Sequence, residues 1–380
     1  MGLNAFFAYT VVLQMGYSWE TALSAVFVEG IIFIILSLTN IREALFNAIP
    51  MTLKKAVSAG IGLFIALIGL FNAQVIVANP ATKISLFSFK TSLTSGTFHT
   101  VGITVVLSLL GVLFTAILME RKVRGNILWG ILFTWILGII CELTGLYVPD
   151  PTQHMFSVIP DFSAGLAAFT PASMEPIFGK IAFEQMLSLD FFVVMFAFLF
   201  VDIFDTLGTL IGVSSKAGML DKEGKLPHIK GALMADAVAT TAGAVLGTST
   251  VTTFVESATG VSEGGRTGLT AMFVAFFFIV SLFLSPLFLA IPAFATAPAL
   301  IIVGFLMLGA ITGIEFDDLT ESIPAYLTII AMPFCYSVSE GICFGVISYV
   351  LVNLLTGNHK KISVLMYILA VLFIGKYIFI

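Results

Sequence analysis

The sequence predicts an all-α polytopic membrane protein, and its composition is the reason. Of the 380 residues, 59% are hydrophobic and only 10% are charged, and the mean hydropathy is +1.09. The surface of a water-soluble protein does not tolerate that composition. Because one spanning helix needs about 20 apolar residues, the chain holds roughly ten to thirteen spans. Little is left over, so a separate soluble enzyme domain is excluded.

Long apolar runs bounded by charge, Gly or Pro predict the spans in chain order. The first six runs cover residues 1–15, 20–38, 53–73, 99–119, 126–147 and 189–213. The later runs cover 231–246, a short piece at 250–260, 266–290, 296–313, 322–337, 340–356 and 362–379. The runs at 322–337 and 340–356 are either two spans or one broken span, which leaves the topology of 322–380 open.

Basic residues in short loops predict the cytoplasmic side of the membrane. Twelve of the 17 Lys and Arg residues fall in four such loops: Arg42, Lys54 and Lys55; Arg121, Lys122 and Arg124; Lys216, Lys222, Lys225 and Lys230; Lys360 and Lys361. The long connection 147–189 is mostly acidic and should lie outside. The first apolar run has no basic flank and no small-residue cleavage site, so we expect it to belong to the mature protein.

Several classes of function have no support in the sequence. Nothing indicates a nucleic-acid partner. The three cysteines lie in apolar surroundings, which favours small buried hydrophobes over a disulfide framework or a thiolate metal site. The four histidines lie in or beside loops without metal-ligand spacing, so we expect no metal site.

The densest group of ionisable residues lies in the run 189–213. Asp202 and Asp205 are three residues apart, which places both carboxyl groups on one helix face with Thr206 and Thr209 nearby. An ionisable residue inside a span costs roughly 3 kcal/mol on insertion scales, so it needs a function. Two like charges so close do not both stay ionised, and one aspartate should hold a proton near neutral pH, as a proton-coupled carrier requires. The alternative is a helix cap and a lysine pair, but no Lys or Arg lies in an adjacent apolar run.

The stretch from Gly247 to Gly260 is rich in Thr, Ser and Gly and contains Glu256. Such backbone is stable at membrane depth only where it is buried in protein or lines a watery cavity. A helix broken there exposes N–H groups, and Glu256 accepts hydrogen bonds from N–H donors. That combination suits a planar substrate with donors and acceptors on its edges. The alternative is a kinked polar helix that serves only packing.

Other polar residues inside apolar runs are weaker candidates. Asn4 carries a lone amide beside Phe6 and Phe7. A contact with substrate and a packing contact between helices are equally good interpretations of it. For Glu29, Asp236 and Glu340 we expect hydrogen bonds between helices rather than contacts with a substrate. The candidate substrate-binding residues are therefore Asn4, Asp202, Asp205, Thr206, Thr253, Phe254, Glu256 and Ser257.

Four stretches in order carry a family resemblance: GLNAFFAY, DIFDTLGTLIG, GTSTVTTFVESATGVSEGGRTGLTA and IPAYLTIIAMPFCYSVSEGICFG. Together they resemble the AzgA-like purine permeases, a branch of the nucleobase-ascorbate transporter family that includes bacterial hypoxanthine/guanine permeases. The resemblance implies a proton symporter that imports hypoxanthine, guanine or adenine across the inner (plasma) membrane of a bacterial cell. It also implies an inverted seven-helix repeat fold with core and gate domains, here with about 11–13 segments. Two discontinuous half-helices with short strands should lie near Asn4 and Glu256.

The resemblance also assigns domains and roles. The core domain should comprise 1–40 and 187–292, and the gate domain 41–186 and 293–380. The acidic motif of segment eight falls on Asp202 and Asp205, the glutamate of segment ten on Glu256, and the amide of the third segment on Asn4. Proton coupling would belong to Asp202, Asp205 and Glu256. The family pattern has two helices ahead of GLNAFF, where this sequence starts.

Two other functions compete with a purine symporter. An aspartic-type intramembrane protease needs a second aspartate motif, and the sequence lacks one. An anion transporter of the same inverted-repeat architecture should keep few carboxylates and hold an Arg or Lys in its site. The partners that we expect are a purine base and the lipid bilayer, with the proton as coupling ion and no other cofactor. A homodimer remains open.

Overall fold

The computed structural model describes residues 4, 6–153, 155–163, 165–182, 189–254 and 256–379. Within these residues, eight helices are long and apolar enough to cross a membrane, and three shorter apolar helices accompany them. The prediction of an all-α polytopic membrane protein is thereby confirmed. The predicted inverted repeat and the predicted division into core and gate stay predictions.

The helices follow the apolar runs closely. The long helices are α2 (Trp19–Leu38), α4 (Met51–Asn72), α6 (Ile103–Glu120), α7 (Asn126–Leu143), α8 (Leu189–Ala217), α9 (Ile229–Leu246), α13 (Ala293–Leu308) and α15 (Val338–Leu355). The shorter apolar helices are α11 (Gly268–Phe283), α14 (Leu319–Phe334) and α16 (Val364–Phe379). The run 266–290 breaks at Leu284, and the run 322–356 forms two helices, α14 and α15, that pack against each other.

Short elements connect the long helices. They are η1 (Phe6–Gln14), α3 (Ile41–Ala48), α5 (Phe89–Thr94), η2 (Phe98–Gly102), η3 (Pro151–Gln153), η4 (Gly165–Phe169), α10 (Ser257–Ser262), α12 (Ser285–Leu289), η6 (Gly309–Gly313) and η7 (His359–Lys361). Strands β1 (Ile76–Asn79) and β2 (Lys83–Leu86) form an antiparallel hairpin.

Among the described residues, the expected strands beside the half-helices are not where the resemblance placed them. In the described residues both strands lie in the hairpin at 76–86, far along the chain from Asn4 and Glu256. Residues 248–254 lie between α9 and α10 without helical or strand pairing. Side-chain hydroxyls bond this segment to neighbouring helices, so it needs no strand partner to satisfy part of its polar groups.

The chain forms two compact units. Unit 1 comprises Met1–Phe64, Ser173–Ala258 and Met307–Ile380, and unit 2 comprises Ile65–Ala172 and Thr259–Leu306. All of the acids in the predicted site, together with Glu29 and Asp236, belong to unit 1. The site is therefore built within one unit.

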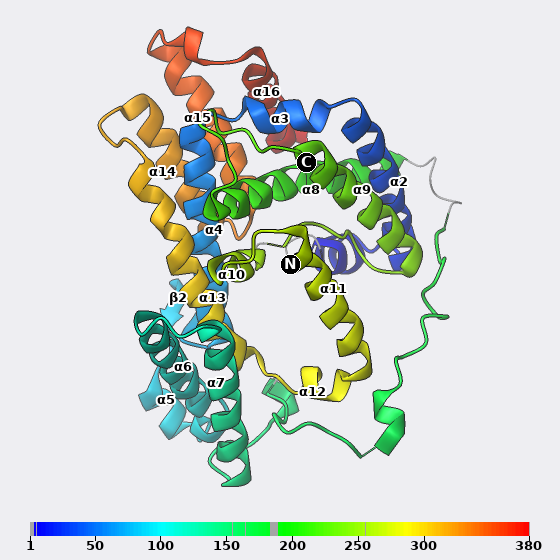
Figure 1. Cartoon of the computed structure of the whole chain (residues 1–380), viewed down its shortest axis with the longest axis vertical. Coiled ribbons are helices and arrows are strands. Elements are labelled where there is room, and N and C mark those ends of the chain that lie inside the picture. The colour runs from blue at the N-terminus through cyan, green and yellow to red at the C-terminus, as the bar shows by residue number, and fades with distance from the viewer. Residues whose placement is uncertain are drawn as a thin grey trace. The chain divides into compact units, whose positions relative to one another are not determined.

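In unit 1, α2 packs along α9 and against α8 (Figure 1). A buried apolar cluster that includes Leu23, Val26 and Phe198 fills this contact. At Gly30 the helices approach so closely that an added Cβ atom would lie 2.9 Å from the backbone nitrogen of Thr241. Because glycine has no side chain, α2 brings its polar face against α9.

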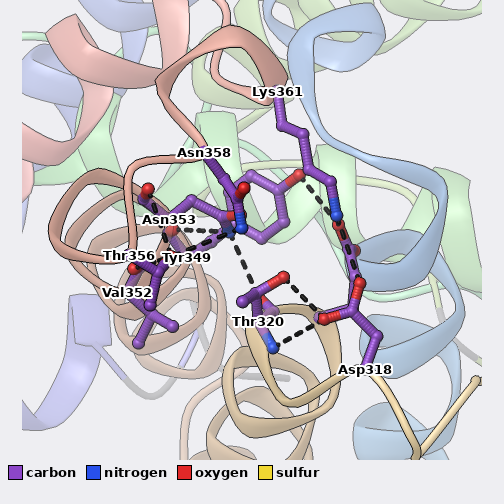
Figure 2. Close-up of polar contacts among 9 residues, drawn as sticks. Asp318, Thr320, Tyr349, Val352, Asn353, Thr356, Asn358 and Lys361 are labelled. Atoms are coloured by element: carbon purple, nitrogen blue, oxygen red, sulfur yellow. Dashed lines mark hydrogen bonds and ion pairs between the residues drawn. The ribbon is translucent and has the colours of Figure 1, made fainter.

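A second group of helices in unit 1 is formed by α14, α15 and α16, and α15 also packs on α8 (Figure 1). Hydrogen bonds join one end of α14 to α15 and to η7 (Figure 2). Asn353 donates to the carbonyl of Thr320 at 3.1 Å, and Lys361 donates to Asp318 at 3.1 Å. These contacts tie three segments together at the start of α14.

Unit 2 is organised around the hairpin of α6 and α7. The two helices meet through paired small residues, because Gly111 faces Thr134 and Gly130 faces Thr115. Small residues let helix backbones approach closely inside a membrane. Ser108 also donates to the carbonyl of Phe294 at 2.8 Å, which fastens α6 to α13.

Candidate functional site

Three helices of unit 1 each place one carboxyl group in the interior. Glu29 of α2 and Asp202 of α8 are 0% exposed, and Asp236 of α9 is 6% exposed. Helix α2, which carries Glu29, packs against both α8 and α9. The close approach of α2 and α9 beside Gly30 explains how residues so distant in the chain meet. We call Glu29, Asp202 and Asp236 the buried acid cluster.

Threonine hydroxyl groups surround the buried acid cluster. Thr206, one turn beyond Asp202, donates to Oδ1 of Asp202 at 3.0 Å. The hydroxyl oxygens of Thr206 and Thr252 are 2.7 Å apart, which joins α8 to the 248–254 segment. Thr250 of the same segment donates to Oε2 of Glu29 at 3.4 Å. The hydroxyl-rich stretch thus lies against the acids, as a site at membrane depth requires.

Arg42 was expected in a cytoplasmic loop, but the structure buries it completely. It lies on α3, which packs on α9, and it donates to Oδ2 of Asp236 at 2.7 Å and to the carbonyl of Leu233 at 3.1 Å. Its guanidinium lies 4.2 Å from the centroid of the Phe33 ring. The sequence shows only neighbours along the chain, whereas the packing of α3 brings this cation to an acid 194 residues away.

Lys54 was also counted among the loop cations and is also buried. It lies in the first turn of α4, where it donates to the carbonyl of Gly224 at 2.6 Å and faces the ring of Phe46. Its charge therefore serves a contact between α4 and the loop before α9. The predicted orientation of the chain in the membrane stays a prediction.

The two aspartates of α8 differ in their exposure to solvent. Asp202 is fully buried, whereas Asp205 is partly exposed. The neighbouring acids that act on the Asp205 carboxyl are Glu256 and Asp236, and within the described residues no hydrogen bond reaches that carboxyl. Glu256 is itself exposed just before α10, and Phe254 is 46% exposed. Asp205 is thus more accessible than Asp202, and Phe254 and Glu256 are exposed.

The remaining predicted residues have varied positions. Asn4 is exposed, and its Oδ1 accepts a hydrogen bond from Ser249 at 3.2 Å, so the N-terminal motif does meet the 248–254 segment. The buried hydroxyl of Thr253 has no partner in the described part of the chain. Ser257 is exposed at the first position of α10. The ring of Phe7 packs on Phe198 at 6.1 Å.

The expectation of interhelical hydrogen bonds is confirmed for Asp236 and Glu340, whereas Glu29 accepts its hydrogen bond from the non-helical segment 248–254. Glu340 of α15 accepts from Lys376 and Tyr377 of α16. Asp236 pairs with Arg42. The sequence identified these acids, but it did not reveal that Glu29 and Arg42 adjoin the predicted site. The available indications were that Glu29 is an acid within an apolar run and that Arg42 is a basic residue on a short amphipathic helix.

Comparisons with known proteins show the family of this chain. A model of the Permease family matches residues 1–344. The chain is 44% identical over 379 residues to a permease of Methanocaldococcus jannaschii and 43% identical over 381 residues to the guanine/hypoxanthine permease PbuG of Bacillus subtilis. It is 39% identical over 380 residues to the adenine permease AdeP of Escherichia coli. Each alignment covers all of this chain and 79% or 80% of the relative.

The family match spans most of the chain, and the relatives align with all of it. Together with the apolar helices, this makes the protein a multi-pass transporter of the cell membrane and not an enzyme. The chain belongs to the permease family, within its branch of AzgA-like purine permeases.

Proposed function

We propose that this chain is a proton-coupled symporter that imports purine nucleobases across the cell membrane by alternating access. The relatives support the substrate class, because PbuG is named a guanine/hypoxanthine permease and AdeP an adenine permease. The observation that carries the proposal is the buried acid cluster, which gathers carboxyl groups from α2, α8 and α9 against the hydroxyl groups of residues 248–254.

On the substrate side, Asp205 and Glu256 bind the purine base. A purine presents ring and amino N–H groups along its edge, and carboxylate oxygens accept such hydrogen bonds strongly. Both carboxyl groups are at least partly exposed, which leaves them free to meet a ligand. The exposed ring of Phe254 offers a face on which a flat base stacks. Further donors and acceptors come from Asn4, Thr206, Thr253 and Ser257.

On the proton side, the acids assigned to proton coupling, Asp202, Asp205 and Glu256, hold a proton while the base is bound. Charge is costly in a low-dielectric interior, so a proton bound together with the base lowers the cost of moving the loaded site. The moving part is the predicted core, 1–40 and 187–292, and it moves against the predicted gate, 41–186 and 293–380. Release of the proton and the base on the cytoplasmic side then resets the carrier.

An anion transporter of the same architecture is the competing function. Its site needs a cation that is free to meet the substrate, because an unpaired negative charge is costly in the interior. Here Arg42, the buried cation beside the acids, already donates to Asp236 and Leu233. Three buried carboxyl groups also repel an anion. The described charges therefore favour a substrate that donates hydrogen bonds.

Uptake of radiolabelled hypoxanthine in cells without purine permeases of their own tests the proposal. Asp205→Asn and Glu256→Gln should each reduce uptake to background while membrane expression stays at the wild-type level. Glu223→Gln is the matched control, because Glu223 is an exposed carboxyl paired with Lys225 in a loop. An uncoupler should abolish wild-type uptake. Uptake at the wild-type level in both site variants contradicts the assignment, and competition by sulfate favours the anion transporter.

A further inference from the structure

Glu29 and Asp202 have matching hydrogen-bond environments. One oxygen of each carboxyl accepts from a threonine hydroxyl, Oε2 of Glu29 from Thr250 and Oδ1 of Asp202 from Thr206. The other oxygen of each, Oε1 of Glu29 and Oδ2 of Asp202, is buried and has no donor among the described residues. Both acids are fully buried, and the helices that carry them, α2 and α8, pack against each other.

Two bare carboxylates in one dry cluster repel each other, and one oxygen of each lacks a donor. One proton between them removes both problems, because the protonated carboxyl donates to the other. We infer that Glu29 and Asp202 form the proton-carrying pair of this transporter, distinct from Asp205 and Glu256, the acids assigned to the base. This inference rests on the proposed function. It assigns the coupled proton to Glu29 and Asp202 in place of Asp202 and Asp205.

The other charged groups around Glu29 and Asp202 do not compete for the coupled proton. From α9 comes Asp236 and from α3 comes Arg42, and these two neutralise each other in a buried ion pair at 2.7 Å. From α8 comes Asp205, which is partly exposed. The 248–254 segment contributes hydroxyl groups only. The pair therefore carries one negative charge with one proton and none with two, so its protonation sets the net charge of the buried site.

The pair is also connected to the segment assigned to the base. Thr206 donates to Asp202 and contacts Thr252 at 2.7 Å, and Thr250 donates to Glu29. Residues 250 and 252 precede Phe254 and Glu256 by a few positions. A change of protonation at the pair therefore alters the hydrogen bonds that hold this segment, which is what coupling between proton and base requires.

Purified protein in liposomes separates proton coupling from base exchange. For one proton per base, a pH difference of one unit sustains accumulation of labelled hypoxanthine of at most about tenfold, since proton activity also differs tenfold. The wild type should approach that ratio. Glu29→Gln keeps the acceptor for Thr250 but removes the shared proton, so it should lose the accumulation and only equilibrate the base. It should still exchange labelled for unlabelled hypoxanthine when no pH difference is present.

Two further variants complete the experiment. Glu20→Gln, in the first turn of the same helix, is the matched control and should accumulate like the wild type. Glu29→Asp keeps a titratable carboxyl and should recover part of the accumulation.

The outcomes are distinct. Glu29→Gln with wild-type accumulation overturns the inference. Loss of both accumulation and exchange in Glu29→Gln and in Glu29→Asp assigns Glu29 a structural role and also overturns it. A wild type that exchanges the base but never accumulates it refutes proton symport itself, and the inference falls with it.

Discussion

Replacing Arg42 tests how the buried acid cluster is stabilised. Arg42 is fully buried and donates to Asp236 at 2.7 Å and to the carbonyl of Leu233 at 3.1 Å, above the ring of Phe33. Arg42→Met keeps much of the side-chain volume but removes the positive charge and its donors. Asp236 then remains in the interior without a cation.

The size of the loss follows from these contacts. Removing one partner of a buried ion pair costs about 3–5 kcal/mol, because the other charge stays unpaired in the interior. The contact with Phe33 is worth about 0.5–2 kcal/mol, but it does not add fully because one guanidinium makes both interactions. We therefore expect Arg42→Met to lose about 3–5 kcal/mol of stability. The double variant Arg42→Met with Asp236→Leu should recover most of that loss, since apolar replacement of a buried pair is often neutral.

Thermal unfolding of the purified protein in detergent measures these differences. Lys225→Met is the control, because it breaks an exposed pair with Glu223 and should change the stability by less than about 1 kcal/mol. The reasoning is refuted if Arg42→Met unfolds at the wild-type temperature. It is refuted equally if the double variant is as unstable as the single one, since the unpaired charge would then not be the cause.

Two further predictions concern contacts between segments of unit 1. Gly30→Val should sharply lower the yield of monodisperse protein, because its Cβ would lie 2.9 Å from the backbone nitrogen of Thr241; a wild-type yield in size-exclusion chromatography contradicts this. Hydrogen bonds from Thr320 and Lys361 hold the pKa of Asp318 below its ordinary value (Figure 2). A lowered pKa stabilises the folded state above the ordinary carboxyl range, and that contribution is lost as the pH falls through the folded-state pKa. Stability should therefore fall less steeply on acidification in Asp318→Asn than in the wild type. An equal fall of stability with pH in the two proteins contradicts a stabilising role for the hydrogen bonds of Asp318.

The pattern of residues along the chain was enough to predict where the membrane helices lie and to which family the chain belongs. The apolar runs 20–38 and 340–356 became α2 and α15 with boundaries that differ by one or two residues. The physical reason is local, because a chain in lipid must satisfy its backbone hydrogen bonds within each helix, so the length and apolarity of a run decide the helix. Four motifs in order identified the purine permease branch, and they placed Asp202, Asp205 and Glu256 in the candidate site.

Which charged side chains meet depends on how the helices pack, and this could not be predicted from the residue pattern. Three residues turn a helix by about 300°, so the sequence left Asp202 and Asp205 nearly equivalent. Packing against α2 buried Asp202 and left Asp205 partly exposed. The pairing of Arg42 with Asp236 depends likewise on how α3 packs on α9. Helical periodicity assigns a residue to a face, but contacts between segments distant in the chain determine what that face meets, and the protonation chemistry of this transporter depends on those contacts.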